Sequence, residues 1–241
     1  MKKYGFITVR VGSSRLKNKC LLPFGDGNIL EHVIRRAKFF GFEPVVCTTE
    51  LKEDDIIEEI AKKEGVLYFR GSAKDKLKRW LDACDKFNID AFHTIDADDP
   101  FFDGELDQQS FNLLLEENYD VVYPPKNIYV GSVGFSIKTD LVRKACENKK
   151  SDDTEMMWYF LEKVPDIKKI EFPVYDIKSS NIRLTLDYEE DYWMLRTVLE
   201  ILGPEATRNQ IEDLFIKNPD LYKMNWFRNK QWAEGQQAKK I

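Results

Sequence analysis

YGFITVRV, residues 4–11, is followed directly by GSSRLKNKCLLP, residues 12–23. The first stretch is short, apolar and rich in β-branched side chains, which predicts a buried strand. The second stretch is polar and basic, which predicts a loop at the end of that strand. The chain therefore begins with a strand that runs into a basic loop, and the segments that follow decide which kind of sheet this strand belongs to.

Segments with helical and strand patterns alternate up to residue 95. Residues 28–40 carry apolar side chains at helical spacing, with Asn28 as a candidate N-cap and Gly41 as a stop. The other segments are strands over residues 44–48, 66–70 and 91–95 and helices over residues 53–65 and 75–87. This alternation predicts an open, mainly parallel α/β sheet with helices on both faces.

The second half of the chain is less regular. Strands are expected over residues 120–123, 132–137, 169–174 and 182–186. Helices are expected over residues 107–117, 140–147, 153–163 and 189–202, and in parts of a polar tail at 209–218 and 226–237. No repeat or low-complexity linker divides the chain, so we expect a single domain over residues 1–241.

Composition excludes several classes of protein. The 241 residues are 43% hydrophobic and 33% charged, which is typical of a globular chain. A net charge of -5 argues against a nucleic-acid binder, and no apolar run approaches the roughly 20 residues of a membrane span. The four cysteines form no CxxC pair, which predicts reduced thiols in a cytoplasmic protein and argues against a zinc site.

The loop after the first strand combines residues that suit a polyphosphate. Glycine, two hydroxyls and backbone amides can wrap phosphate oxygens, while Arg15 and Lys19 can neutralise their charge. The loop matches neither the Walker pattern GxxxxGK[ST] nor GxGxxG, so a dinucleotide site is disfavoured. On composition alone, a solvated basic loop explains the segment equally well.

Acidic residues follow two of the expected strands. Alternation turns Asp96 and Asp98 to one side at the end of the strand over 91–95, where a hard cation such as Mg²⁺ would relieve their repulsion. A turn with a helix cap is the competing interpretation. The second group, Asp187 to Asp191, also fits the acidic first turn of a helix. Together with the basic loop, these groups suggest a site for a nucleoside triphosphate and magnesium.

Four ordered segments resemble the motifs of a known family. They are VRVGSSRLKNK (9–19), FRGSAKDKLKR (69–79), DADDPFFD (96–103) and RLTLDYEED (183–191). They are similar to A-R-x-G-S-S-R-L-P-G-K, F-R-G-S-x-x-D-x-L-x-R, T-G-D-x-P-x-x-D and R-L-T-x-D-x-P-E-D. These are motifs of the cytidylyltransferases that activate sugar acids, including CMP-Kdo and acylneuraminate synthetases, and the SpsF-like spore-coat polysaccharide branch is the most similar. NPDLYKMN (218–225) is similar to a later motif, N-P-D-L-x-x-x-N.

The chain departs from these motifs at a few positions. Lys17 and Asn18 replace Pro-Gly in the basic loop, Asp96 and Ala97 replace Thr-Gly or Gln-Gly, and Glu189 replaces a proline. Residues 126–158, where the acceptor should bind, depart most.

The resemblance implies a fold and a set of site residues. The fold is a three-layer α/β/α sandwich of the GT-A-like nucleotide-diphospho-sugar transferase type, with a mainly parallel mixed sheet. Its implied parts are a nucleotide-binding half (1–105), an acceptor and metal-completing half (106–205) and a C-terminal helical tail (206–241). The implied catalytic residues are Arg15, Lys19, Asp98 and Asp187, of which Asp98 and Asp187 bind the metal. The implied nucleotide-binding residues are Arg10, Gly12, Ser13, Ser14, Arg70, Gly71, Ser72 and Asp75.

The activity implied is transfer of CMP from CTP to a small anionic sugar-type acceptor, with Mg²⁺ as cofactor and release of pyrophosphate. The resemblance also implies a role in surface polysaccharide or glycan biosynthesis. It further implies a cytoplasmic homodimer with no nucleic-acid or membrane partner. One alternative keeps the fold but changes the base or acceptor, as in a guanylyltransferase or a phosphonate cytidylyltransferase. Another is a nucleotide-binding protein without catalysis.

Some reactive residues are assigned no chemistry. His93 is expected to be structural because it lies within a strand, and Cys20 to be a packed thiol. His32 is expected on a solvated helix face beside Arg35 and Arg36. A second group could meet an anionic acceptor or simply belong to a surface loop: Lys126, Tyr129 and Ser132.

Overall fold

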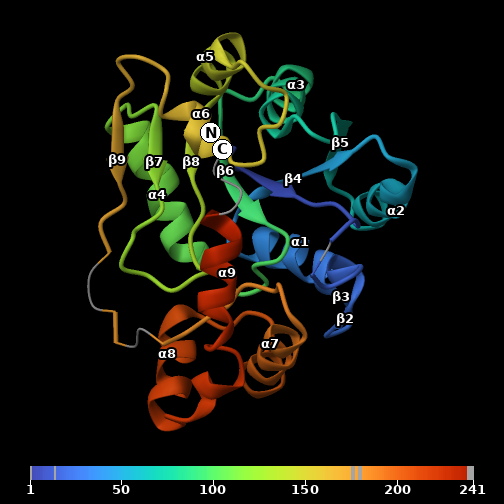
Figure 1. Cartoon of the computed structure of the whole chain (residues 1–241), viewed down its shortest axis with the longest axis vertical. Helices are drawn as coiled ribbons and strands as arrows, with labels where there is room; N and C mark the ends of the chain where they lie inside the picture. Colours follow the sequence, from blue (N-terminus) through green and yellow to red (C-terminus); the bar gives the residue numbers. More distant parts are fainter. Residues whose placement is uncertain (1, 14, 175–176, 179–180, 238–241) are drawn as a thin grey trace.

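A sheet in the order β5-β4-β1-β6-β8-β7-β9 forms the centre of the protein (Figure 1). The computed structural model describes residues 2–13, 15–174, 177–178 and 181–237. The strands are β1 (Tyr4–Thr8), β4 (Glu43–Thr49), β5 (Leu67–Gly71), β6 (Ala91–Asp96), β7 (Val121–Tyr123), β8 (Ser136–Lys138) and β9 (Lys169–Glu171). Only β8 among them runs antiparallel to its neighbours, β6 and β7, so the prediction of a mainly parallel mixed sheet is confirmed.

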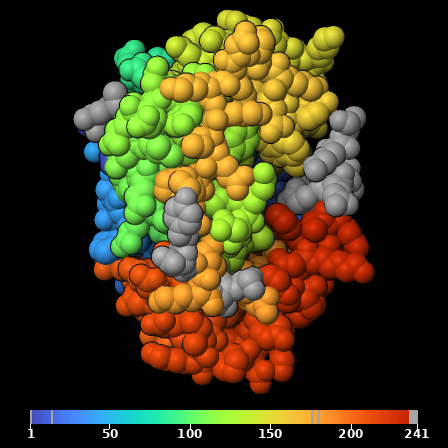
Figure 2. All heavy atoms as spheres, turned by 90° about the vertical axis from the view of Figure 1, so that its left-hand side faces the viewer, coloured from blue at the N-terminus to red at the C-terminus, as the bar shows by residue number. Residues whose placement is uncertain are grey.

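Helices cover both faces of this sheet, which gives the expected three layers. One face carries α1 (Ile29–Phe39), α2 (Asp55–Lys63) and α4 (Gly104–Glu116), and the other carries α3 (Lys76–Phe87), α5 (Thr139–Asn148) and α6 (Met157–Leu161). The C-terminal helices α7 (Glu189–Leu202) and α8 (Arg208–Lys217) lie at one end of the molecule, and α9 (Arg228–Gln237) extends from them toward the sheet; the three are coloured orange to red in Figure 1, and Figure 2 shows the same end. Short 3₁₀ turns and a small hairpin connect the layers: η1 (Lys19–Leu21), η2 (Lys52–Asp54), η3 (Leu221–Met224), β2 (Pro23–Phe24) and β3 (Gly27–Asn28).

The two faces arise from the period of two along each strand. Ile7 is paired in register with Val46 and Ile95, and all three pack in the cluster that includes α1. Its neighbour Phe6 points to the opposite face, where it stacks on Phe92 at 4.1 Å between ring centroids. Central strands that are buried on both faces explain why the sequence reads as continuous apolar runs there.

The start of α1 follows the predicted cap. Asn28 Oδ1 accepts a hydrogen bond from the Glu31 amide at 2.9 Å, and Glu31 Oε2 accepts one from the Asn28 amide at 2.9 Å, which is a capping box. Gly41, with φ of 83°, follows the last turn as expected. The prediction of a solvated His32 is wrong, since its ring is buried and its Nε2 lies 2.8 Å from the Pro100 carbonyl oxygen.

Four predicted elements differ in the structure. The strands expected over 132–137 and 169–174 are shortened to β8 and β9, respectively. Residues 182–186 form no strand, because beyond one bridge between Val130 and Arg183 no neighbouring strand pairs with this segment in the described residues. The helix expected over 153–163 is confined to α6, because Thr154 is drawn to the start of α3, where its hydroxyl accepts from the Leu77 amide at 3.0 Å.

Within the described residues, no helix is both long and apolar enough to cross a membrane. All four cysteines are free. Cys20 is buried as expected, and burial raises the pKa of its thiol to about 11.

Candidate active site

Lys19 joins the basic loop to both acidic segments. Adjacent parallel strands β1 and β6 pair Thr8 with Asp96 in register, so the chain leaves both strands at the same edge of the sheet. There the Lys19 Nζ lies 2.5 Å from Asp98 Oδ2 and 3.0 Å from Asp187 Oδ1, and donates to the Leu186 carbonyl at 2.8 Å. The two carboxylates therefore converge on one positive group.

These contacts fix the charges of the cluster. Burial alone would lower the pKa of Lys19, but the charges and hydrogen bonds of Asp98 and Asp187 outweigh it and raise the pKa above its usual value. Burial alone would raise the pKa of Asp98, but the nearby ammonium group keeps that pKa below its usual range. Lysine and aspartate are thus held as a charged pair.

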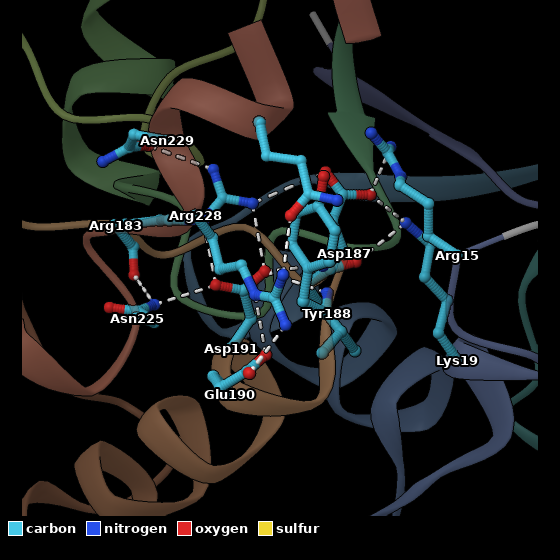
Figure 3. A network of polar contacts seen from close by, with 12 residues as sticks. Arg15, Lys19, Arg183, Asp187, Tyr188, Glu190, Asp191, Asn225, Arg228 and Asn229 are labelled. Atoms are coloured by element: carbon cyan, nitrogen blue, oxygen red, sulfur yellow. Dashed lines mark hydrogen bonds and ion pairs between the residues drawn. The ribbon is translucent and has the colours of Figure 1, made fainter. Parts of the chain in front are cut away.

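Arg15 approaches Asp187 from the same side as Lys19 (Figure 3). Its Nη2 lies 2.6 Å from Asp187 Oδ1, and its guanidinium lies 5.7 Å from the centre of the Tyr188 ring. The Arg15 side chain is 28% exposed and the Asp187 side chain only 3%. A largely buried carboxylate therefore faces two cations, one of which keeps access to solvent.

Backbone hydrogen bonds carry Asp187 to Asp98 although no strand forms there. The Leu186 amide donates to the Asp98 carbonyl at 2.7 Å, and the Leu184 amide donates to the Val130 carbonyl at 2.9 Å. The segment 183–187 is therefore fixed to the end of β6, and the separation of Asp98 and Asp187 is set by the main chain.

The end of β6 offers more carboxylate oxygen than Lys19 can satisfy. One ligand atom from each of Asp96, Asp98 and Asp99 lies within 4.8 Å of the others. Asp99 Oδ1 is buried and has no hydrogen-bond partner among the described residues, and burial beside Asp98 and Asp96 raises the pKa of Asp99 well above its usual value. Clustered carboxylate oxygens are the hard ligands that a divalent cation such as Mg²⁺ prefers.

The other described residues of the basic loop that were expected to bind the nucleotide are at least partly exposed. Arg10 is half exposed, with its guanidinium 3.7 Å from Glu155, and Gly12 is exposed. Ser13 is partly buried, whereas Ser14 lies outside the described residues. The loop is anchored by the Val11 amide, which donates to Asp54 Oδ1 at 2.7 Å.

The second predicted nucleotide segment lies at the end of β5 and is internally bonded. Arg70 lies 2.7 Å from Asp55 and donates to the carbonyls of Thr49 at 3.0 Å and Leu51 at 2.9 Å. Gly71 ends β5. These contacts show that the Arg70 guanidinium fixes the loop after β4.

Ser72 and Asp75 fix the start of α3. Ser72 Oγ accepts from the Asp75 amide at 3.1 Å, and the Asp75 carboxylate caps α3 at the Lys78 amide and pairs with Lys149 at 2.5 Å. Arg79 donates to the Ser72 carbonyl at 2.5 Å, which ties α3 to the loop that precedes it.

The residues set aside in the sequence take structural positions. His93 is fully buried, with Nε2 2.9 Å from Asp107 Oδ1 and Nδ1 2.8 Å from Ser136 Oγ, so it has no access to a substrate. Tyr129 and Ser132 are buried, whereas the Lys126 side chain is 88% exposed and pairs with Glu171. Of the residues considered for the acceptor, only Lys126 is thus a surface residue.

A network behind Asp187 was not identified from the sequence. Arg183, Asp191 and Asn225 are fully buried and bonded to one another, and Arg228 pairs with Glu190 at 2.7 Å (Figure 3). The motifs RLTLDYEED and NPDLYKMN contain the first three of these residues. Asp191 ends the first motif and Asn225 ends the second, and the two belong to one buried cluster. The spacing of the motifs in the sequence does not indicate this contact.

Two carboxylates and two cations thus gather at the carboxyl edge of a mainly parallel sheet, which is where proteins of this architecture bind nucleotides. A family model described as Cytidylyltransferase matches residues 5–199, and the chain belongs to this family.

Related proteins extend over nearly the whole chain. The "Uncharacterized protein MJ1063" of Methanocaldococcus jannaschii is 35% identical over 234 residues, which cover 93% of this chain and 95% of the relative. The spore coat polysaccharide biosynthesis protein SpsF of Bacillus subtilis is 25% identical over 228 residues, 89% and 94% of the two chains.

Solved structures agree with this assignment. A cytidylyltransferase from Leptospira borgpetersenii superimposes with a TM-score of 0.84 at 32% identity and covers 92% of this chain and 97% of its own. A CMP-2-keto-3-deoxy-manno-octonic acid synthetase complexed with CTP gives 0.63 at 15% identity, with 83% and 99% covered, which is a likeness of fold. The family and fold implied by the sequence motifs are confirmed, and the protein is a nucleotidyltransferase.

Proposed function

We propose that the protein is a Mg²⁺-dependent cytidylyltransferase that transfers CMP from CTP to a small anionic sugar-type acceptor and releases pyrophosphate. The observation that carries the proposal is the convergence of Asp98 and Asp187 on Lys19 Nζ, at 2.5 and 3.0 Å, with Arg15 beside them. Cations for a polyphosphate and carboxylates for a metal ion thus occupy one edge of the sheet.

The reaction is an in-line displacement at the α-phosphorus of CTP. An oxygen of the acceptor forms the new bond to phosphorus, the bond to the β-phosphate oxygen breaks, and the electron pair leaves with pyrophosphate. Arg15 and Lys19 stabilise the charge that grows on the leaving group. Asp98 and Asp187 would hold the magnesium ion, which supplies positive charge to phosphate oxygens when bound.

The remaining nucleotide-binding residues divide into two groups in this proposal. Backbone and hydroxyl groups of the basic loop bind the triphosphate; they belong to Arg10, Gly12, Ser13 and Ser14. The segment from the end of β5 to the start of α3 forms a wall beside the base and ribose; it contains Arg70, Gly71, Ser72 and Asp75. Because the Arg70 and Asp75 side chains are bonded internally, this wall is held in place before the nucleotide binds.

The relatives support the nature of the substrate and the setting. The printed name of SpsF associates that protein with spore coat polysaccharide biosynthesis, and the CMP-2-keto-3-deoxy-manno-octonic acid synthetase was solved with CTP. One structural neighbour, Rv0371c of Mycobacterium tuberculosis, was solved in complex with manganese. We extend to this chain a role in surface polysaccharide or glycan biosynthesis, carried out by a cytoplasmic homodimer without nucleic-acid or membrane partners.

Pyrophosphate release with MgCl₂ tests the proposal. CTP, GTP, UTP and ATP are each paired with sugar acids, sugar phosphates and phosphonates. Release with CTP and a sugar acid is the expected result, and release with GTP instead would identify a guanylyltransferase. Nucleotide binding without release from any pair would favour a protein without catalysis, and a chain that binds no nucleotide would contradict the proposal.

A further inference from the structure

The Asp191 carboxylate, at the third residue of α7, holds the backbone that carries Asp187. Its Oδ2 accepts hydrogen bonds from the Asp187 amide at 2.9 Å and from the Tyr188 amide at 3.0 Å. An acidic residue at this position commonly reaches back to the N-cap amide, and here that residue is Tyr188. The second bond, to Asp187, goes beyond a helix cap and fixes the proposed metal ligand itself.

Asp191 also neutralises a buried guanidinium beside Asp187. Arg183 Nε donates to Asp191 Oδ1 at 2.8 Å and Arg183 Nη2 donates to Asp191 Oδ2 at 3.0 Å, a bidentate pair that is fully buried. The same Nη2 lies 3.6 Å from Asp187 Oδ2. Without Asp191, Arg183 would be an uncompensated buried charge, and the nearest carboxylate in the described network would be that of Asp187.

The C-terminal segment completes the arrangement. Asn225 Nδ2 donates to Asp191 Oδ1 at 3.0 Å and to the Arg183 carbonyl at 3.1 Å, and Arg183 Nη1 donates to Asn229 Oδ1 at 3.1 Å. Figure 3 shows Arg15 and Lys19 on one side of Asp187 and this network on the other. Asn225 is fully buried, so its amide has no alternative partner in solvent.

We propose that Asp191, held by Asn225, is a positioning residue that fixes Asp187 and keeps Arg183 from neutralising it. The Asp187 carboxylate then stays available to the cation of the active site. This inference rests on the proposed function, because it concerns the ability of Asp187 to hold a metal ion.

Binding of Mn²⁺ to Asp191→Asn tests the inference. The amide has nearly the size of the carboxylate but no charge. The buried Arg183 guanidinium is therefore expected to pair with the Asp187 carboxylate instead. We expect the affinity for Mn²⁺ alone, measured from the free-ion EPR signal, to fall roughly 10-fold. With the enzyme's acceptor, kcat should fall much more than KM for CTP rises, because Arg15 and Lys19 still bind the triphosphate.

Glu31→Gln provides a matched control. Glu31 is also a buried acidic residue at the third position of a helix, where it accepts from the Asn28 amide at 2.9 Å. We expect Glu31→Gln to lower the melting temperature while leaving the Mn²⁺ affinity of the wild type. Asp187→Asn serves as the reference for loss of the metal ligand.

A folded Asp191→Asn protein that binds Mn²⁺ as the wild type does, while Asp187→Asn has lost affinity, would overturn the positioning role and leave the proposed function standing. If Asp187→Asn also binds like the wild type, the metal assignment fails and the positioning role fails with it. Should Asp191→Asn not fold, Asn225→Ala replaces it. A smaller fall in Mn²⁺ affinity is then expected, and an unchanged affinity overturns the inference.

Discussion

Replacing Lys19 with methionine removes the internal cation of the active site without shortening the side chain much. Removing one partner of a fully buried ion pair costs about 3–5 kcal/mol. Here the cost is smaller, because Asp98 is 29% exposed and Asp187 keeps Arg15 at 2.6 Å. We expect a loss of roughly 2 kcal/mol in the free energy of unfolding, which corresponds to a melting temperature lower by about 4–8 °C.

MgCl₂ should reverse this loss. In the variant, Asp98 and Asp187 face one another without Lys19, so a divalent cation no longer competes with an ammonium group for them. A cation present at 100 times its dissociation constant stabilises a folded protein by about 2.7 kcal/mol. The melting temperature of Lys19→Met should therefore rise more with MgCl₂ than that of the wild type, while pyrophosphate release falls by about 10²–10³-fold for lack of the cation.

Thermal denaturation with and without MgCl₂ measures both effects, and Lys149→Met is the control. Lys149 has a similar exposure, 11%, and lies 2.5 Å from the buried Asp75, but it is not bonded to Asp98 or Asp187. It should lose stability without gaining a larger response to MgCl₂. A Lys19→Met protein as stable as the wild type, with the same response to MgCl₂, would refute the reasoning.

Three further substitutions test other parts of the molecule. Burial lowers the pKa of His32 to about 4 in the folded protein, so the unfolded chain takes up a proton between pH 6.5 and 4 that the folded chain does not, and stability falls with falling pH. His32→Gln should remove about 3 kcal/mol of this fall in the free energy of unfolding, measured by urea unfolding between pH 6.5 and 4. The same dependence of stability on pH in the variant and the wild type would contradict this prediction. Arg70→Ala should raise KM for CTP with little change in kcat, since Arg70 fixes the loop after β4, and a wild-type KM would contradict the proposed nucleoside wall. Gly131→Ala should lower stability by at least about 1–2 kcal/mol, because φ is 82° and the added Cβ would lie 2.6 Å from the Thr185 amide nitrogen; an unaltered melting temperature argues against this.

The first half of the fold was predictable because local signals there agree with tertiary structure. Asn28 caps α1 as expected, and the apolar runs of β1, β4 and β6 are buried on both faces. Residues 182–186 read as a strand for the same apolar reason, yet their burial comes from contact with Val130 and the C-terminal helices rather than from a sheet. His32 was assigned to solvent from its charged neighbours, but α1 turns its ring toward Phe24 and Phe101.

The candidate site was predictable only in part. Family motifs indicated Arg15, Lys19, Asp98 and Asp187, and the fold brings these four side chains together. The support behind them was not predictable, because Asp191 meets Asn225 through tertiary packing that no local pattern records.

Pyrophosphate release by Asp98→Asn is the most direct test of the central claim that Asp98 and Asp187 carry CTP-dependent transfer. With CTP, MgCl₂ and the acceptor found in the panel, the wild type should turn over. Asp213→Asn, a change on the exposed face of α8, should do so equally. Asp98→Asn should lose at least about 10²-fold while remaining folded. An Asp98→Asn enzyme that releases pyrophosphate at the wild-type rate would contradict the account.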